Sequence, residues 1–387
     1  MNRSTAKMAA QTAAFVALAL APQFLSAYNL SLLGRFLALS VLALGLTIVW
    51  GWGGILSLGQ GVFFGLGAYA LAMYLKLAGL GAGELPDFME WSGTDHLPWW
   101  WGIFHHAWVA IAGVVLVPMA SAAALAWLVF RRRVGGVYFA LITQALALAF
   151  ATLLVSEQAF TGGFNGLTDF HSVFGYSLMD PAFQRSLYWI TLGFVAAAFL
   201  ALRWLLGTRF GKILLAIRDG ENRIRFLGYN PVPYKIVAFA LGGALAGISG
   251  ALFTLHVGVI SPAMAGVVPS IEMIVWVAVG GRESLAGAVA GTLLVNFGKD
   301  WISSAMPNLW LFMMGLLFVL VVTVLPKGLA GAPQSLGPQL AAIRRMRARM
   351  RERKDSRKAG ARKSCLGDAA AAACRATSTA ECESRHE

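Results

Sequence analysis

The sequence has few charged residues, few cysteines and no phosphate loop. Only 13% of its 387 residues are charged and 58% are hydrophobic, whereas roughly a quarter of an ordinary globular chain is charged. This excludes a soluble enzyme and a disordered regulator. The three cysteines, Cys365, Cys374 and Cys382, lie near the C-terminus without metal-ligand spacing, which excludes a disulfide scaffold. The stretch 207–213 is one residue short of a phosphate loop and lacks its Ser or Thr, so ATP binding by that route is not expected.

Ionisable residues are also scarce inside the apolar segments. Glu157, Glu272 and Asp300 are the acids nearest to segment interiors, and each lies close to an end. Because proton-driven pumps usually carry intramembrane ionisable side chains, this scarcity argues against a self-powered transporter. It is compatible with a facilitative channel. The clustered acids, His or Ser of a membrane enzyme are lacking too. The sequence therefore indicates no catalytic, cofactor or metal site.

Long apolar segments dominate the chain. A membrane helix needs about 20 mostly apolar residues, and ten segments qualify, some weakly. They are 8–27, 30–50, 52–76, 104–130, 136–157, 187–206, 234–257, 269–281, 285–304 and 309–326. The third is rich in glycine and the eighth is short, so either could be broken or re-entrant, and eight to eleven crossings are expected. The sequence predicts an all-α, polytopic membrane domain over residues 1–330. Division into five plus five spans would invert the second half relative to the first.

The placement of Lys and Arg predicts the orientation. Basic blocks at 131–133, at 203–225 and in the tail are separated by even numbers of spans, so the positive-inside rule places all three, and both termini, in the cytoplasm. Residues 331–387 are predicted to be a basic, mostly disordered tail, with 11 Lys and Arg against two acids between Ala341 and Lys363. A basic helix over 339–357 on anionic lipid is the alternative to a solvated charge run. The net charge of +13 therefore indicates topology rather than nucleic-acid binding.

The largest cytoplasmic connection runs from Gly207 to Pro233. Residues 213–227 are compatible with a helix, and Gly228 stands where a glycine commonly ends one. Ile217 belongs to its apolar side, and the mixed-charge side consists of Arg218, Asp219, Glu221, Arg223 and Arg225. A mixed-charge helix between two spans is what a docking element for a soluble partner needs. An ordinary polar loop is the alternative.

Several stretches resemble motifs of the permease subunits of ATP-binding-cassette importers for branched-chain amino acids and related amides. They are GGILSLGQGVFFGLGAY at 53–69, TGGFNGL at 161–167, AIRD at 216–219 with LG at 227–228, and parts of 260–287. The resemblance covers about residues 30–330, with the motifs in the family's order. The outer loop 85–93, with its neighbouring tryptophans, and the stretch 275–282 are most similar to the urea-type permease, the second permease chain of that importer. Arg282-Glu283-Ser284 departs from the Arg-Gly-Thr expected there.

This resemblance implies a permease subunit of an ATP-driven importer in the bacterial inner membrane. The implied partners are a second homologous permease chain, two ATPase subunits that bind the ATP, and an extracytoplasmic solute-binding protein. The helix at about 213–228 would couple ATP hydrolysis to transport. Urea is the substrate expected from the finer resemblance. Branched-chain amino acids or other small amides are the alternative, and a stand-alone facilitative channel is an alternative of another class.

Polar and small residues are candidates for the translocation path. Amide and hydroxyl groups offer donors and acceptors that match urea, and the candidates are Gln60, Tyr69, Thr143, Gln144 and Asn165. Each could instead form a helix–helix hydrogen bond or a turn. Glycines would let the backbone unwind beside a cavity or let helices pack closely. They are Gly53, Gly54, Gly59, Gly61, Gly65 and Gly67 in the third segment, with Gly162 and Gly163 in the later motif.

Overall fold

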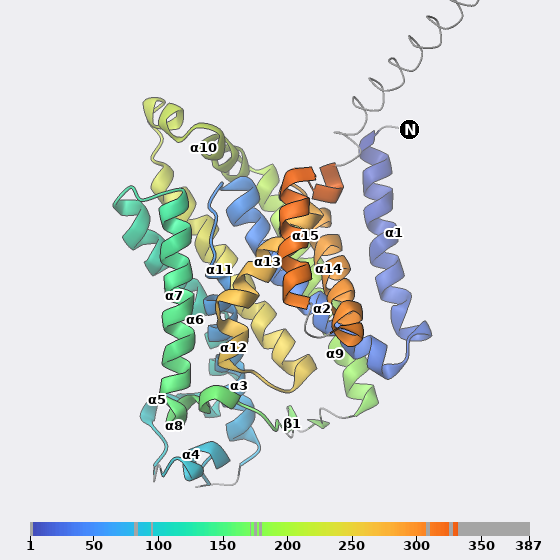
Figure 1. Ribbon diagram of the computed structural model, residues 1–387, viewed down its shortest axis with the longest axis vertical. Coiled ribbons are helices and arrows are strands. Elements are labelled where there is room, and N and C mark those ends of the chain that lie inside the picture. Colours follow the sequence, from blue (N-terminus) through green and yellow to red (C-terminus); the bar gives the residue numbers. More distant parts are fainter. Residues whose placement is uncertain are drawn as a thin grey trace, which may run out of the picture. The chain divides into compact units, whose positions relative to one another are not determined.

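The structure is a computed structural model that describes residues 3–80, 84–93, 96–170, 172–173, 176–177, 180–306, 310–324 and 328–331 (Figure 1). Contacts group Met1–Ala330 into one compact unit. The basic tail predicted from residue 331 onward lies outside the described residues except for Gly331, and so does the helix considered over 339–357.

Each of the ten predicted spans coincides with a helix. These helices are α1 (Arg3–Phe24), α2 (Ala27–Leu46), α3 (Gln60–Ala78), α6 (Ala107–Arg131), α7 (Val137–Ser156), α9 (Pro181–Gly207), α11 (Pro231–Val257), α13 (Val267–Gly280), α14 (Leu285–Ala305) and α15 (Trp310–Val324). By length and composition, six are able to cross a membrane: α2 extended to Trp52, α3, α6, α7, α9 and α11. α13 and α15 have 14 and 15 residues, fewer than the roughly 20 of a full span. The all-α polytopic fold is confirmed.

Short elements connect these helices. They are η1 (Thr47–Trp52), a π-helical turn, α4 (Asp87–Trp91), α5 (Trp99–Gly102), η2 (Ile103–His105), α8 (Gln158–Thr161), η3 (Gly163–Asn165), α10 (Arg209–Phe226) and α12 (Pro262–Ala265). β1 (Ser172–Val173) pairs antiparallel with β2 (Tyr176–Ser177), with Ser172 opposite Ser177.

The Gly-rich third segment is broken, whereas the short eighth segment is a continuous helix with a non-helical residue just before it. η1 ends at Trp52 and α3 begins only at Gln60, so a continuous helix from residue 52 is wrong, and 53–59 is a non-helical connection. α13 is preceded by the four-residue α12 and by an extended Gly266. Each non-helical position precedes the third span of its five-span half.

α2 forms the centre of the unit. Its buried face continues from Leu30 to Leu46 with few gaps, and α9, α11 and α14 pack against it. α11 also packs on α3 and α6. Close approach makes this packing possible, because a Cβ on Gly67 of α3 would lie 2.3 Å from the Cα of Gly247 in α11. α2, α3 and α11 therefore pack together at the centre of the hydrophobic core.

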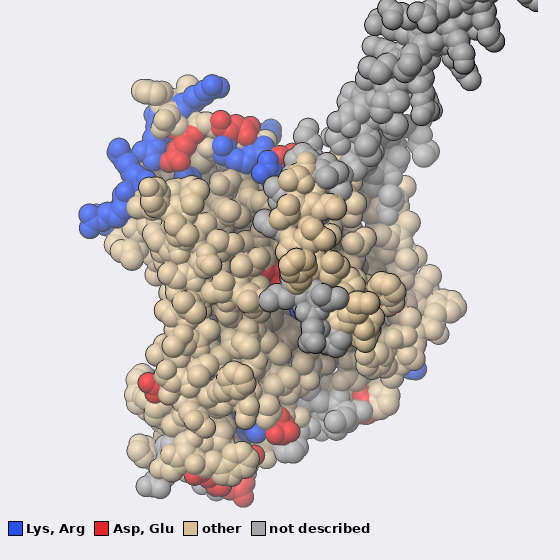
Figure 2. Space-filling view, in the orientation of Figure 1, with Lys and Arg blue, Asp and Glu red and all other residues tan. Residues whose placement is uncertain are grey.

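Most charged side chains lie at the two ends of the helical unit, and the band between them on the face shown in Figure 2 is mostly uncharged. α10 is at one end, and α4, α5 and α8 are at the other (Figure 1). α1 runs antiparallel to α9, since Gln11 accepts a hydrogen bond from Arg203 whereas the Leu18 carbonyl accepts one from the Tyr188 hydroxyl. The start of α1 therefore lies at the α10 end.

Candidate functional site

The connection 53–59 is held between two other helices. The Leu58 N–H donates to Thr143 Oγ1 of α7 at 3.0 Å, and the Gly61 N–H donates to Ser270 Oγ of α13 at 3.0 Å. Thr143 and Ser270 are fully buried. The break is therefore stabilised by tertiary contacts. Side chains accept hydrogen bonds from backbone N–H groups that a continuous helix would have bonded to its own carbonyls.

The glycines of the third segment have two roles. Gly59 lies in the break, where a Cβ would be 2.3 Å from the Thr143 carbonyl oxygen. Gly54 has a φ of +66°, a conformation that favours glycine, and Gly53 also belongs to the break. By contrast, Gly61, Gly65 and Gly67 approach α11, α12 and α13 closely. Unwinding and close packing, the two interpretations of these glycines, thus each apply to part of the set.

Gln60 begins α3 and is only 1% exposed. Neither its amide oxygen nor its amide nitrogen has a hydrogen-bond partner among the described residues. The Tyr69 hydroxyl, about 13 Å further along α3 by helix rise, is likewise buried without a partner in the described ranges. A buried amide without partners costs free energy, so Gln60 is the strongest of the predicted path residues for a polar contact with a transported molecule.

The other predicted path residues lie apart. Thr143 holds the break, as described above, and Gln144 is half-buried on α7. Asn165 is exposed in η3, which follows α8 at the end opposite α10 (Figure 1). Gly162 and Gly163 have φ values of +76° and +57° and shape that turn. The structure therefore does not bring Asn165 together with Gln60.

α10 confirms the helix expected in the largest polar connection, so the ordinary-loop alternative is wrong. The helix begins four residues earlier than predicted, at Arg209, and bends at Gly220. Gly228 follows its end with a φ of +86°, and its N–H donates to the Arg225 carbonyl. This is the role predicted for that glycine.

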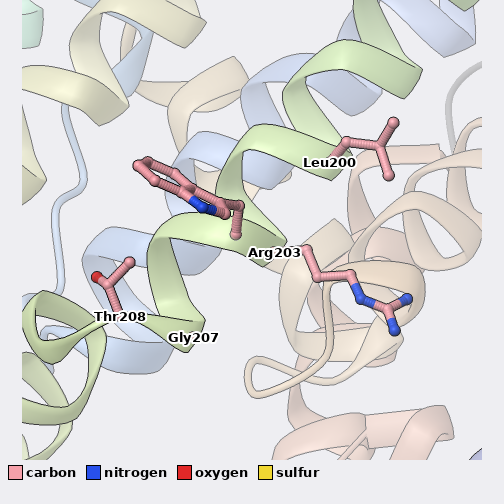
Figure 3. A pocket seen from close by; sticks show the side chains of 5 residues that line it. Leu200, Arg203, Gly207 and Thr208 are labelled. Carbon is pink, nitrogen blue, oxygen red and sulfur yellow. The ribbon is translucent and has the colours of Figure 1, made fainter.

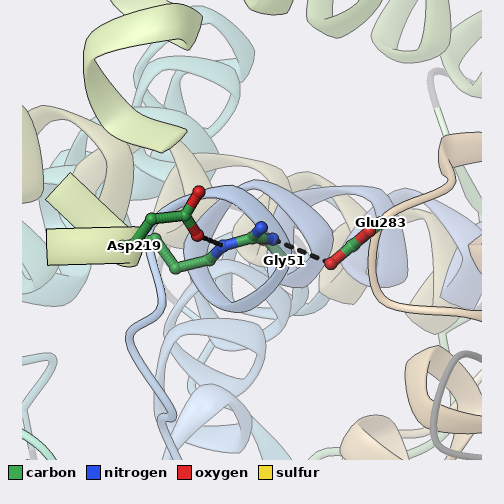
Figure 4. Close-up of polar contacts among 4 residues, drawn as sticks. Gly51, Asp219 and Glu283 are labelled. Atoms are coloured by element: carbon green, nitrogen blue, oxygen red, sulfur yellow. Dashed lines mark hydrogen bonds and ion pairs between the residues drawn. The ribbon is translucent and has the colours of Figure 1, made fainter. Parts of the chain in front are cut away.

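Arg218 on α10 is bonded inward. Its Nη1 donates to the Gly51 carbonyl at 2.6 Å and to Glu283 Oε1 at 3.1 Å, and its Nε donates to Asp219 Oδ1 at 3.0 Å. Figure 4 shows Asp219 and Glu283 on opposite sides of this contact. We call Arg218, Asp219, Glu283 and the Gly51 carbonyl the tether cluster, because it joins α10 to η1 and to the α13–α14 connection. Sequence reasoning missed Glu283 as a partner, although its departure from the family pattern placed a carboxylate there.

Glu221 joins the second part of α10 to α11. Its carboxylate accepts hydrogen bonds from Arg225 Nη2 at 2.6 Å and Lys235 Nζ at 2.5 Å. Burial would raise the pKa of Glu221, but the hydrogen bonds and charges of Lys235 and Arg225 outweigh it and lower that pKa below its usual value.

The remaining α10 residues divide between core and solvent. Ile217 is buried, whereas Asp219 and Arg223 are exposed. Beyond them, Phe226 and Leu227 are 91% and 72% exposed at the end of the helix. The sequence analysis did not single out Phe226. An apolar tip of this kind is available to a partner.

An open hollow lies where α9 meets α10, lined by Leu200, Arg203, Trp204, Gly207 and Thr208 (Figure 3). Tryptophan and arginine at the end of an apolar helix are typical of the membrane–water interface. This explains the hollow without a ligand.

Four charged side chains gather inside the unit, and sequence reasoning did not connect them. The Glu272 carboxylate accepts hydrogen bonds from Lys299 Nζ at 2.7 and 3.0 Å, and Arg35 Nη2 lies 3.7 Å from Asp300 Oδ1. Lys299 and Asp300 fall within predicted span 285–304, and adjacent charges inside a span were the available signal. Within the part of the chain that the structure describes, no three His, Cys, Asp or Glu residues group so as to hold a metal ion.

Comparison with known proteins gives consistent similarities. The sequence model of a family described as "Branched-chain amino acid transport system / permease component" matches residues 28–322. The high-affinity branched-chain amino acid transport system permease protein LivM of Salmonella typhimurium is 27% identical over 312 residues, which cover 75% of this chain and 67% of that protein. BraD of Pseudomonas aeruginosa is 24% identical, and LivH of Salmonella typhimurium 23%; for each, 76% of this chain and 92% of the relative are covered. No solved structure matches.

Proposed function

The chain belongs to the family of permease components of branched-chain amino acid transport systems, and from this premise we propose that it is the permease subunit of an ATP-driven importer of branched-chain amino acids. It acts with a second homologous permease chain, two ATPase subunits and an extracytoplasmic solute-binding protein. ATP binding and hydrolysis belong to the ATPase subunits, so this chain is a transport subunit rather than an enzyme.

The tether cluster is the observation that carries the mechanism. Arg218 bonds both the last turns of the second span, through Gly51, and the α13–α14 connection, through Glu283. A displacement of α10 by the ATPase subunits would therefore act on η1, and through it on the break at 53–59. A rigid-body motion at one end of the molecule would in this way change the backbone at Gln60.

Amino acids replace urea as the proposed substrate. The relatives reported above are named for branched-chain amino acids, whereas nothing in those similarities favours urea. Specificity at the first step would reside in the solute-binding protein.

We infer that the α10 end faces the cytoplasm of the bacterial inner membrane. Arg131, Arg132 and Arg133 end α6 and begin the connection to α7, and the basic residues of α10 lie at the same end (Figure 2). The positive-inside rule then places α10 and the start of α1 in the cytoplasm, where ATPase subunits are found.

The test is uptake by the complete importer reconstituted in proteoliposomes. We expect ATP-dependent uptake of radiolabelled leucine and none of urea. Uptake of either molecule without ATP would instead indicate the facilitative channel, and ATP-dependent uptake of urea alone would overturn the amino-acid assignment.

Docking on α10 is tested by the double variant F226D/L227D. We expect loss of ATPase co-purification, because two charges replace exposed apolar contacts, while thermal stability of the permease stays unchanged. The matched control is W91D, which places a charge on an equally exposed aromatic of α4 at the opposite end. ATPase binding by F226D/L227D equal to that by W91D would contradict the docking site.

A further inference from the structure

A cavity of about 270 Å³ lies among α2, α3, α11, α12, α13 and α14. Its walls include Arg35, Glu272, Lys299 and Asp300, which we call the cavity cluster. The rest of the lining is mostly apolar and includes Phe64, Phe253 and Met273. The volume is just below the roughly 300–1,000 Å³ of pockets that hold drug-sized ligands, so the cavity suits a smaller molecule.

The cavity cluster consists of two cations and two anions. Glu272 has a side chain only 8% exposed and is bonded to Lys299, whose side chain is 37% exposed. Removing a carboxylate such as that of Glu272 from water is costly, and an ion pair that is partly buried repays only part of this cost. Ionisable groups within membrane spans therefore commonly mark a substrate pathway.

The second pair retains capacity for a ligand. The 3.7 Å between Arg35 Nη2 and Asp300 Oδ1 is longer than a hydrogen bond, and both side chains are partly exposed, at 33% and 41%. A guanidinium carries five N–H donors in a planar fork that matches a carboxylate. An anion entering the cavity could thus bond Arg35 without breaking a short hydrogen bond to Asp300.

Net neutrality together with apolar walls describes a particular ligand class. An amino acid with an aliphatic side chain carries one carboxylate, one ammonium group and an apolar body. The two cations of the cavity cluster match the carboxylate, its two anions match the ammonium group, and aromatic and Met walls match the side chain. Urea has no charge, so it would form no ionic contact with either pair.

We propose that this cavity binds the zwitterion of a small aliphatic amino acid within the permease. Arg35 and Lys299 hold the α-carboxylate, Glu272 and Asp300 hold the α-ammonium group, and the side chain lies against Phe64, Phe253 and Met273. This proposal rests on the proposed function and adds a site to it. Arg35 lies in the third turn of α2 and Asp300 near the end of α14, both toward the end opposite α10. An incoming amino acid would meet the cavity before the break at Gln60.

The experiment measures binding of radiolabelled leucine to the membrane assembly in nanodiscs. This assembly contains both permease chains and both ATPase subunits but not the solute-binding protein. The main variant is E272Q/K299Q, because neutralising both members of the pair leaves no uncompensated charge and should preserve folding. We expect its Kd for leucine to rise at least tenfold, and R35Q to raise it similarly. The matched control R203Q removes a cation from α9 outside the cavity and should leave the Kd within twofold.

Ligand analogues supply a second readout on the unmodified importer. N-acetyl-leucine lacks the ammonium group and leucinamide lacks the carboxylate, so both should compete with leucine at least tenfold more weakly than isoleucine does. Equal competition by all three, an unchanged Kd in both E272Q/K299Q and R35Q, or no measurable leucine binding to the unmodified importer would each overturn the site. If leucine uptake with ATP and the binding protein persists in those cases, only the cavity proposal fails; if that uptake is absent too, the proposed function fails.

Discussion

The tether cluster and the cavity cluster are built from the same residue types but use them differently. Arg218 donates at 2.6 Å to a backbone carbonyl and is also paired with Glu283. Arg35 lies over the ring of Phe36 and 3.7 Å from the carboxylate of Asp300, beside a cavity. A guanidinium fixed to the backbone joins two elements mechanically, whereas one that faces a cavity next to a loose partner can exchange that partner for a ligand. The surroundings, rather than the residue type, decide which role an arginine takes.

The connection 53–59 lies between these two regions. Its start contacts the tether cluster, since Gly54 packs against Arg218. Its end leads into α3, where Phe64 lines the cavity. Substitutions along this path test the different roles of the two regions.

The largest effect is expected at Gly59. G59A places a Cβ 2.3 Å from the Thr143 carbonyl oxygen, so the backbone of α3 or α7 must shift. Overpacking of this kind costs roughly 1–3 kcal/mol, and we expect about 3 kcal/mol, because the obstacle is backbone rather than a side chain. Thermal unfolding in nanodiscs measures it. In the control G193A nothing lies within 4 Å of the new Cβ in α9, and a small stabilisation is expected. Equal melting temperatures would show that the break is not clamped.

The second-largest effect is expected from R218A, which removes the central side chain of the tether cluster. R218A removes three hydrogen bonds from a charged donor, to the Gly51 carbonyl, Glu283 and Asp219, and bonds of this kind are each worth roughly 1.5–3 kcal/mol when buried. Since the Arg218 side chain is 23% exposed, we expect about 1.5 kcal/mol in total, together with ATPase activity that no longer drives leucine uptake. K212A, at an exposed position of α10 outside the tether cluster, serves as the control and should change stability by less than about 0.5 kcal/mol. Normal coupling in R218A would remove the mechanical role of the cluster.

A substitution at Gln60 is expected to change stability and uptake in opposite directions. Q60L replaces a buried amide that has no partner in the described residues by an apolar side chain of similar size. We expect the permease to become more stable by about 1–2 kcal/mol, while leucine uptake falls. Thermal unfolding and uptake are measured on the same preparation. A destabilised Q60L protein would mean that the amide has a structural role, and a stabilised protein with full uptake would remove Gln60 from the path.

The smallest effect concerns Glu221 and pH. Its pKa is lower in the folded protein than its usual value of 4.5, so its stabilising contribution is complete above that value and is lost as the pH falls through the folded pKa. The contribution is at most about 1 kcal/mol because the group is partly exposed. The melting temperature of the unmodified protein should exceed that of E221Q at pH 7, and the difference should shrink below about pH 4.5. If the melting temperatures of the unmodified protein and E221Q changed in parallel with pH, the hydrogen bonds from Lys235 and Arg225 to Glu221 would not stabilise the fold.

Much of the fold was predictable from local sequence. Apolar length located ten helices, and clustered glycines identified the broken third segment, whereas the short eighth segment is a continuous helix. Gly228 was predicted because a helix end needs a residue that tolerates positive φ. The site was less predictable. Thr143 and the glycines of the third segment were identified by residue type, but the groups that meet there are far apart in the chain: Leu58 bonds Thr143 and Gly61 bonds Ser270.

Hydrophobicity and backbone propensity by themselves determined the helices, their breaks and the identity of the polar connection, because these depend on residues close in sequence. Only the tertiary structure decided which charges meet. Arg218 with Glu283 is separated by 65 positions and Glu272 with Lys299 by 27, and periodicity carries no information about such pairs. Helix packing brought one group onto a backbone carbonyl and the other around a cavity, and the role of each follows from that placement.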